Sequence, residues 1–239
     1  MTKILNAKGR PFSWSFSRLN DFENCPKKYA ESSFYCTAPY VQTPEGAWGD
    51  RVHKAAEMFM KGIPHKDEEA LAPVEPYCTQ IIRSGCHTEA ELEIALTRDL
   101  KLTNWFSGAA WLRIKIDLIV EISKIVSSLV DWKTGRTIKH DQDQLRLAAA
   151  VLNILRPHIK QYKGAYIWTQ HKKVVPIDPI DASECPAIWE GFIARVYRME
   201  EAWRLERFPA RPSGLCPWCQ SPNCASRRGE RRGDGVRMY

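Results

Sequence analysis

The 239-residue sequence contains no run of 18 uninterrupted apolar residues, so it offers no candidate transmembrane helix. Its first ten residues, Met1 to Arg10, lack the apolar stretch and small-residue cleavage site of a secretory signal. Internal repeats and low-complexity tracts are also missing, which excludes repeat architectures and disordered proteins. We therefore expect a cytoplasmic protein with no membrane partner.

Acidic residues are in deficit. The chain has 28 Asp and Glu against 35 Lys and Arg, a formal net charge of +7. This balance favours a polyanionic partner, with nucleic acid the first choice. At this length, folding buries roughly 70 to 75% of the unfolded surface without help from a metal or a disulfide. We expect one compact unit, in which any metal site exists for a reason other than collapse.

The apolar pattern predicts an α/β fold. Period-two alternation predicts strands at residues 89–100, 111–121, 125–133, 162–169 and 173–177. Helical spacing predicts helices at residues 49–62, 141–155 and 183–207. The short link at 121–124 predicts an antiparallel hairpin whose paired residue numbers sum to 247 or 248. We therefore expect a mostly antiparallel sheet flanked by helices, with Asp117 facing Asp131.

Two facing carboxylates repel each other unless a cation lies between them or one is protonated. Asp117 and Asp131 therefore indicate a divalent metal, and their oxygen ligands suit Mg²⁺ or Mn²⁺. Lys133 lies on the same strand face as Asp131, and His53 offers an imidazole from a helix. A metal, two acids and a lysine suffice for phosphodiester hydrolysis. The alternative is a solvated acid pair with an ordinary Asp131–Lys133 ion pair.

Three cysteines near the C-terminus, Cys216, Cys219 and Cys224, have the spacing C-x2-C-x4-C, which is typical of thiolate metal binding. A fourth ligand is missing nearby, because no histidine follows Cys224. Position near the C-terminus argues against a thioredoxin-like redox pair. The remaining cysteines are interpreted as ordinary thiols: Cys36, Cys78, Cys86 and Cys185.

Several motifs together resemble the RecB-like branch of the PD-(D/E)XK nucleases, in particular exonucleases of the phage and CRISPR-associated iron-sulfur type. They occur in the family's order between about Ser15 and Cys224. They are Ser15-Phe16-Ser17-Arg18-Leu19, Cys25-Pro26-Lys27-Lys28-Tyr29, Gly49-Asp50-Arg51-Val52-His53, Ile116-Asp117, Val130-Asp131-Trp132-Lys133-Thr134-Gly135 and Gln144-Leu145-Arg146-Leu147. The resemblance implies a restriction-endonuclease-like core, in which a mixed sheet with a central antiparallel hairpin is flanked by helices.

The resemblance also implies roles for individual residues. The metal ligands would be His53, Asp117, Asp131 and the carbonyl of Trp132. Lys133 would be the catalytic lysine, and Gln144 would help to position the active site or the DNA. The chain departs from the family at Ala148, where the family usually has a tyrosine four residues after the glutamine.

In iron-sulfur members of this group, one early and three late cysteines hold a [4Fe-4S] cluster. Cys25 with Cys216, Cys219 and Cys224 matches that arrangement. The cluster would join the N- and C-terminal segments and serve a structural role, because hydrolysis needs no electron transfer. Zn²⁺ is the less favoured alternative, and a site without metal is the third.

A single RecB-like nuclease domain is expected over residues 1–239. Its parts are an N-terminal helical segment (1–48), a catalytic core (49–180), a C-terminal helix with the cysteine cluster (181–226) and a basic tail (227–239) that either contacts phosphates or is solvated. The expected function is an exonuclease acting on DNA ends or single-stranded DNA in recombination, repair or phage replication. The setting would be the cytoplasm of a bacterial or phage-infected host cell.

The alternative from another class is a non-catalytic DNA-binding subunit of a nuclease complex that keeps the iron-sulfur clamp. The joint presence of His53, Asp117, Asp131 and Lys133 argues against it. A redox iron-sulfur protein would need a second cofactor signature, which the sequence lacks. The motifs leave open the polarity of degradation, the strand preference, any endonuclease activity, the oligomeric state and partners such as recombination or replication proteins.

Overall fold

The computed structural model describes residues 4–38, 41–138, 141–219, 221 and 224–226. The chain divides into two compact units. Unit 1 comprises Met1–Val41, Leu96–Arg113 and Ile193–Tyr239, and unit 2 comprises Gln42–Ala95 and Ile114–Phe192. The predicted basic tail at 227–239 lies outside the described residues. No helix in the described part of the chain is long and apolar enough to cross a membrane.

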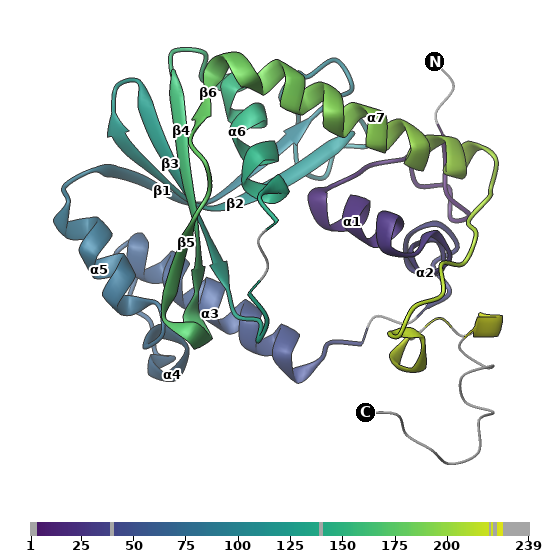
Figure 1. Cartoon of the computed structure of the whole chain (residues 1–239), viewed down its shortest axis with the longest axis horizontal. Helices are drawn as coiled ribbons and strands as arrows, with labels where there is room; N and C mark the ends of the chain where they lie inside the picture. Colours follow the sequence, from purple (N-terminus) through teal and green to yellow (C-terminus); the bar gives the residue numbers. More distant parts are fainter. Residues whose placement is uncertain (1–3, 39–40, 139–140, 220, 222–223, 227–239) are drawn as a thin grey trace. The chain divides into compact units, whose positions relative to one another are not determined.

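A mixed sheet organises unit 2. Its strands are β1 (His87–Leu96), β2 (Leu112–Ser123), β3 (Val126–Lys133), β4 (Gln161–Trp168), β5 (Lys173–Pro176) and β6 (Ile180–Asp181). The order is β1-β2-β3-β4-β5, with β6 paired to β4. Strands β2 and β3 form an antiparallel hairpin, whereas β3 and β4 are parallel (Figure 1). The predicted mixed sheet with a central hairpin is therefore confirmed.

The hairpin register brings the two predicted acids to the end of the paired β2–β3 ladder. Leu118 pairs with Val130, so the numbers of paired residues sum to 248. The ladder ends at this pair, and Asp117 and Asp131 are the next residues of the two strands, close enough for the charge of Asp117 to raise the pKa of Asp131. Because β3 and β4 are parallel, the chain needs a crossover between them, and helix α6 (Asp143–Leu155) supplies it.

Helices cover both faces of the sheet in unit 2. Helices α3 (Pro44–Met60), α4 (Glu68–Leu71) and α5 (Glu75–Arg83) share one face. Their core residues, such as Val52 and Ala55, pack with Leu118 and Val130. Helix α6 lies on the opposite face (Figure 1), where the backbone at Gly164 approaches Leu145 and Ile177 closely. The predicted helical layers are therefore present.

Unit 1 is built from short helices and aromatic side chains. Its helices are α1 (Phe16–Asn24), α2 (Pro26–Tyr29), a π-helical turn at Ala30–Phe34, the C-terminal part of α7 (Cys185–Arg204) and a 3-10 turn at Cys216–Trp218. The Trp203 ring contacts Phe12 and Phe34 edge-on, with centroids 5.0 and 5.2 Å away. Its indole N–H donates to the Tyr29 hydroxyl at 2.9 Å. The N-terminal segment and α7 therefore share one aromatic core.

Candidate metal centre and cysteine pocket

A histidine and two carboxylates from three elements meet in unit 2. His53 belongs to α3, Glu91 to β1 and Asp117 to β2. His53 Nδ1 lies 3.2 Å from Asp117 Oδ2 and 3.9 Å from Glu91 Oε1. One donor atom of each side chain lies within 4.8 Å of the other two. An imidazole nitrogen and two carboxylate oxygens at this spacing form a ligand set for a divalent cation.

Glu91 joins this group because β1 is distorted at that residue. Its φ is +56°, a left-handed conformation that is uncommon for a residue with a side chain and typical of bulges. The carboxylate is 6% exposed and forms an ion pair with Lys115 of β2. Glu91 is not among the residues predicted from sequence, because strict alternation assigns it to a polar face with Glu93 and nothing in the sequence marks the distortion.

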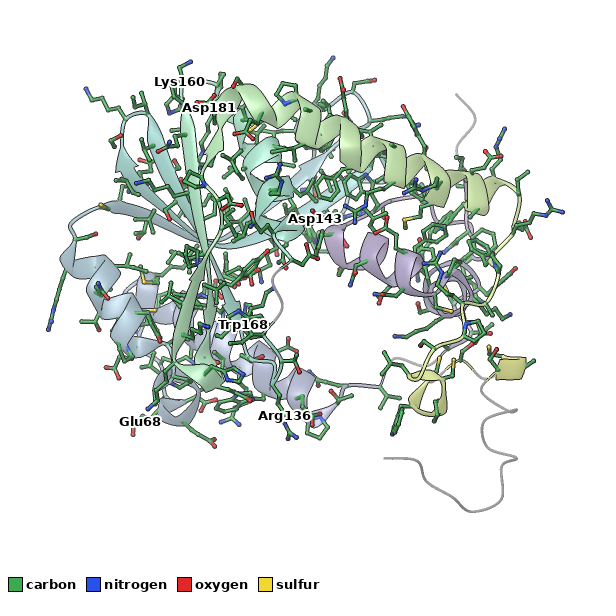
Figure 2. The ribbon with its side chains drawn as sticks, viewed as in Figure 1. Glu68, Arg136, Asp143, Lys160, Trp168 and Asp181 are labelled. Atoms are coloured by element: carbon green, nitrogen blue, oxygen red, sulfur yellow. The ribbon has the colours of Figure 1, made fainter. Side chains whose placement is uncertain are left out.

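A second connected group consists of Asp131, Lys133 and Gln144. Lys133 Nζ lies 2.6 Å from Asp131 Oδ2 and donates to Gln144 Oε1 at 2.8 Å. The Gln144 amide N–H donates to Asp131 Oδ1 at 2.5 Å. Gln144 is the second residue of α6, after Asp143, which Figure 2 labels. The glutamine therefore uses both ends of its amide to hold the acid and the lysine in one arrangement.

The backbone of β3 connects the two groups. Asp117 Oδ2 accepts a hydrogen bond from the Trp132 N–H at 2.9 Å. The structure thus gathers five predicted site residues in one region of unit 2: His53, Asp117, Asp131, Lys133 and Gln144. Asp131 is engaged by Lys133 and Gln144 and is not one of the three donors within 4.8 Å. The Trp132 carbonyl as a metal ligand stays a prediction.

A glycine allows α3 to approach the end of β3. A Cβ atom at Gly49 would lie 3.1 Å from Thr134 Oγ1, a closer contact than most side chains tolerate. Gly49 precedes His53 by one helical turn, and Thr134 directly follows Lys133. The parallel ladder places Trp168, labelled in Figure 2, beside Lys133 at the same end of the sheet. The small residue thus keeps the histidine and the lysine on elements that pack closely.

The position at which the family has a tyrosine is Ala148, and it is buried. An aromatic ring reaches the lysine from a different element. Lys133 Nζ lies 5.1 Å from the ring centroid of Tyr166 on β4. This distance is within the range of a cation–π contact, so the ring helps to hold the ammonium group.

Burial and charge shift the proton affinities in the site. Burial, followed by the charge of Asp117, raises the pKa of Asp131 to about 6. Burial alone would lower the pKa of His53, but the hydrogen bond to Asp117 and the nearby carboxylates raise it overall. Both groups therefore keep a proton to a higher pH than they would in water, and a proton on either one lowers the repulsion between the acids. A bound cation would replace those protons.

This replacement predicts a steep pH dependence of metal binding. His53 and Asp131 both have raised pKa values, so as metal ligands both would have to lose a proton before a cation could bind. Affinity for Mn²⁺ should therefore reach its maximum above neutral pH and should fall by about two to three orders of magnitude between pH 8 and pH 5. Isothermal titration calorimetry with Mn²⁺ measures this. A His53→Asn variant should bind more weakly with a shallower profile, and an unchanged profile would contradict the role of His53.

A second cluster of His87, Glu89 and Glu121 also brings donor atoms within 4.8 Å. Arg156 already pairs with Glu89 at 2.7 Å and with Glu121 at 3.5 Å. The Arg156 guanidinium thus already acts as the cation that contacts both acids, and we assign no metal to this cluster.

The four predicted cluster cysteines meet in unit 1. Cys25, Cys216, Cys219 and Cys224 all line one small pocket. Cys25 Sγ accepts a hydrogen bond from the Arg211 N–H at 3.4 Å, and Cys216 Sγ accepts one from Ser213 at 3.3 Å. Backbone N–H groups that point at sulfur stabilise a thiolate. The pocket therefore has the donor set of a thiolate metal site.

Sequence comparison gives an independent result. The model of the PD-(D/E)XK nuclease superfamily matches residues 77–224, more than half of the chain. The matched segment contains Glu91, Asp117, Asp131, Lys133 and Gln144. His53 and Cys25 lie outside it. No protein of curated function matches the sequence.

Structure comparison supports the fold. A candidate exonuclease from Eubacterium rectale aligns with a TM-score of 0.53 and 13% identity, over 89% of this chain and 88% of that one. An alkaline exonuclease from Laribacter hongkongensis aligns with a TM-score of 0.33 and 10% identity, over 81% of this chain and 92% of that one. The first alignment shows that the same fold spans nearly the whole of both chains.

Proposed function

The chain belongs to the PD-(D/E)XK nuclease superfamily and is a phosphodiester hydrolase, and on that premise we propose that it is a metal-dependent DNA exonuclease. Its substrates would be DNA ends or single-stranded DNA, in recombination, repair or phage replication. The observation that carries this proposal is the arrangement of His53, Glu91 and Asp117 next to the linked group of Asp131, Lys133 and Gln144. A cytoplasmic location is part of the proposal.

His53, Asp117 and Asp131 are the proposed metal ligands, with the Trp132 carbonyl and Glu91 as further ligands. The donor set suits Mg²⁺ or Mn²⁺, because it is mostly oxygen with one imidazole. The buried, mutually repelling acids fit a cation at this place. When bound, the cation would polarise the phosphate and lower the pKa of a coordinated water.

The side chains of Lys133 and Gln144 have separate proposed roles. The Lys133 ammonium is fixed by Asp131, Gln144 and the Tyr166 ring, so it is held in one orientation before substrate arrives. It would orient the attacking water or neutralise negative charge that develops on the phosphate. Gln144 would keep Asp131 and Lys133 in register with each other. Preorganisation of this kind is effective because little reorganisation is needed during the reaction.

Cleavage of linear and circular DNA tests the proposal. End-labelled single-stranded and duplex DNA would be incubated with Mg²⁺, Mn²⁺ or EDTA, with covalently closed circular DNA in parallel. An exonuclease shortens linear DNA only in the presence of metal and leaves closed circles intact, and the label gives its polarity. Cleaved circles would refute the exonuclease assignment. Folded protein that binds DNA and cuts nothing with either metal would instead be a non-catalytic subunit.

Glu91 is expected to tune metal affinity. Glu91→Gln keeps the shape and removes one charged ligand, so Mn²⁺ affinity should fall about 10- to 100-fold and high metal should restore cleavage. Titration of DNA cleavage against Mn²⁺ concentration measures the shift. Glu93→Gln is the matched control, because Glu93 lies on the same strand and is exposed. Equal metal titrations for both variants would remove Glu91 from the site.

The cysteine pocket is proposed to hold a [4Fe-4S] cluster. Zinc in a closed tetrahedral site places its sulfurs only about 3.8 Å apart, given Zn–S bonds of about 2.3 Å. Among the described residues, no three cysteine sulfurs lie within 4.8 Å of one another. Four cysteines line the pocket, a donor set that fits a four-iron cluster. In that role the cluster would hold Cys25 near α1 to the C-terminal segment of unit 1.

A further inference from the structure

The segment between β1 and β2 forms a rigid loop in unit 1. One tight turn is closed by the Thr97 N–H, which donates to the Lys101 carbonyl at 2.8 Å. In a second turn, the Phe106 N–H donates to Asn104 Oδ1 at 2.8 Å, and the Ser107 N–H donates to the Asn104 carbonyl at 3.0 Å. The loop at 97–110 therefore has a defined shape.

An arginine on β2 fixes the tip of this loop. Arg113 Nε donates to the Trp105 carbonyl at 2.7 Å, and its Nη2 donates to the Ser107 carbonyl at 3.2 Å. These two carbonyls flank Phe106 in the chain. The residue between them is thus presented by a backbone that is hydrogen-bonded on both sides.

Phe106 is 90% exposed, the largest exposed fraction among the large hydrophobic residues of the described chain. Folding gains almost nothing from a ring left in water, so its presence on a rigid loop calls for another reason. In the same loop Asn104, Ser107 and Gly108 are polar or small, Trp105 is half-buried, and Leu102 is exposed. An exposed flat ring with one other exposed large apolar side chain in its loop suits stacking on a base better than docking in an extended apolar interface.

Two arginines near the loop lack acidic partners. Arg18 donates to the carbonyl and hydroxyl of Ser13, and Arg113 donates to the two loop carbonyls. Neither guanidinium forms an ion pair with a carboxylate in the described part of the chain. Burial and the charge of Arg18 lower the pKa of Arg113, so the two cations lie within electrostatic reach. No acidic residue occurs between Leu100 and Arg113. An anion bound here would relieve their repulsion.

We propose that Phe106 stacks on a base of single-stranded DNA whose backbone phosphates contact Arg18 and Arg113. The inference deepens the proposed function and rests on it for the identity of the polymer. The combination of an aromatic platform with unpaired cations is what single-stranded nucleic acid requires: the ring binds the base, and the guanidinium groups bind the phosphates. Stacking of this kind tolerates any base, so the contact would strengthen binding without selecting a sequence.

Binding to a labelled single-stranded oligodeoxynucleotide tests the contact. Every protein carries Lys133→Ala so that the DNA stays intact, and fluorescence anisotropy gives the dissociation constant. Phe106→Ala should weaken binding by on the order of tenfold, Phe106→Trp should retain it, and Phe106→Leu should resemble Phe106→Ala. Leu102→Ala is the matched control, because Leu102 is 64% exposed in the same loop and cannot stack. The affinity of Leu102→Ala for the oligodeoxynucleotide should equal that of its parent.

Two further measurements separate the ring from the charges. An oligonucleotide with abasic sites should lose about the same tenfold with the parent protein, and Phe106→Ala should lose little more on it. Arg18→Gln should reduce the slope of log affinity against log salt by about 0.7, the value for one single-strand phosphate contact. The proposal would be overturned if Phe106→Ala lost as much affinity on the abasic strand as on the normal strand. It would also be overturned if Arg18→Gln had the same salt slope as its parent.

The outcomes distinguish this contact from nuclease function. Equal affinity of Phe106→Ala and its parent overturns the contact, as does full retention of binding by Phe106→Leu. A changed oligomeric state with unchanged DNA affinity would identify the ring as a protein contact and also overturn it. Cleavage by the chain with native Lys133, measured separately, decides the nuclease. If the chain cleaves DNA but Phe106→Ala does not change binding, the nuclease function stands and the Phe106 contact is overturned. If binding depends on Phe106 but the chain does not cleave DNA, the contact stands and the nuclease function is overturned.

Discussion

Lys133→Ala is expected to slow DNA cleavage by on the order of a thousandfold, the scale seen when one preorganised electrostatic group is removed. Asp131 at 2.6 Å and Gln144 at 2.8 Å hold the Lys133 ammonium in one orientation, and the substitution removes this oriented charge. Cleavage of end-labelled DNA at saturating Mg²⁺ gives the rate. The side chain is partly exposed at the edge of the site, so its removal leaves no large cavity in the core.

A matched control separates chemistry from a general loss of charge. Lys163→Ala removes a lysine from the neighbouring strand β4, where the side chain is exposed, and should cleave like the unaltered chain. Lys133→Met keeps most of the side-chain volume and should be as slow as Lys133→Ala. Both Lys133 variants should still bind DNA and Mn²⁺. Cleavage within a few fold of the unaltered chain would show that another group stabilises the developing charge.

Cys219→Ser is expected to abolish the proposed cluster in unit 1 and to lower the melting temperature by about 10 to 20 °C. A cluster bound by Cys25 and Cys216 closes a loop of about 190 residues, and a cross-link of that length contributes about 5 kcal/mol in the chain-entropy model. Each kcal/mol corresponds to about 2 to 4 °C in a chain of this size. Iron and sulfide analysis, visible absorbance and thermal melts under anaerobic conditions measure these changes.

Cys86→Ser provides the control, because Cys86 is a half-buried thiol in unit 2, outside the cysteine pocket. It should leave the colour, the iron content and the melting temperature nearly unchanged. Cys25→Ser should resemble Cys219→Ser if the fourth ligand is assigned correctly. A colourless anaerobic preparation that contains zinc would reject the cluster. Full iron in Cys25→Ser would reject only that ligand.

The central part of the fold was accessible from sequence because its signals are local. Alternation and the short link at 121–124 determine the β2–β3 hairpin, and the observed sum of 248 agrees with the predicted register. The β3–β4 pairing was harder to anticipate, because parallel strands leave no turn signal and depend on how α6 packs. In unit 1 the cysteine pattern, interpreted through the family resemblance, predicted that the N- and C-terminal segments meet, but nothing in the sequence marks the contribution of Leu96–Arg113.

The residues of the candidate site also differ in whether local sequence signals predict them. Asp131 and Lys133 follow from strand alternation, and Asp117 follows from the register. His53 and Gln144 depended on resemblance, because a lone helical histidine or glutamine carries no chemical signal of its own. Neither the strand pattern nor the family resemblance identified Glu91, because its place in the site depends on a left-handed backbone at one residue of β1. Such a distortion is stabilised by tertiary contacts and cannot be inferred from alternation.

The division of unit 1 among three chain segments has a consequence for synthesis on the ribosome. Its N-terminal segment ends at Val41, but the segment that completes it begins at Ile193. At about 5 to 20 residues per second, roughly 10 to 30 s separate the emergence of these two parts. During that interval aromatic residues such as Phe12 and Phe34 have no Trp203 to pack against. Newly made chains therefore expose these rings until Trp203 has emerged, so the aromatic core of unit 1 forms only after all strands of the unit 2 sheet have been made.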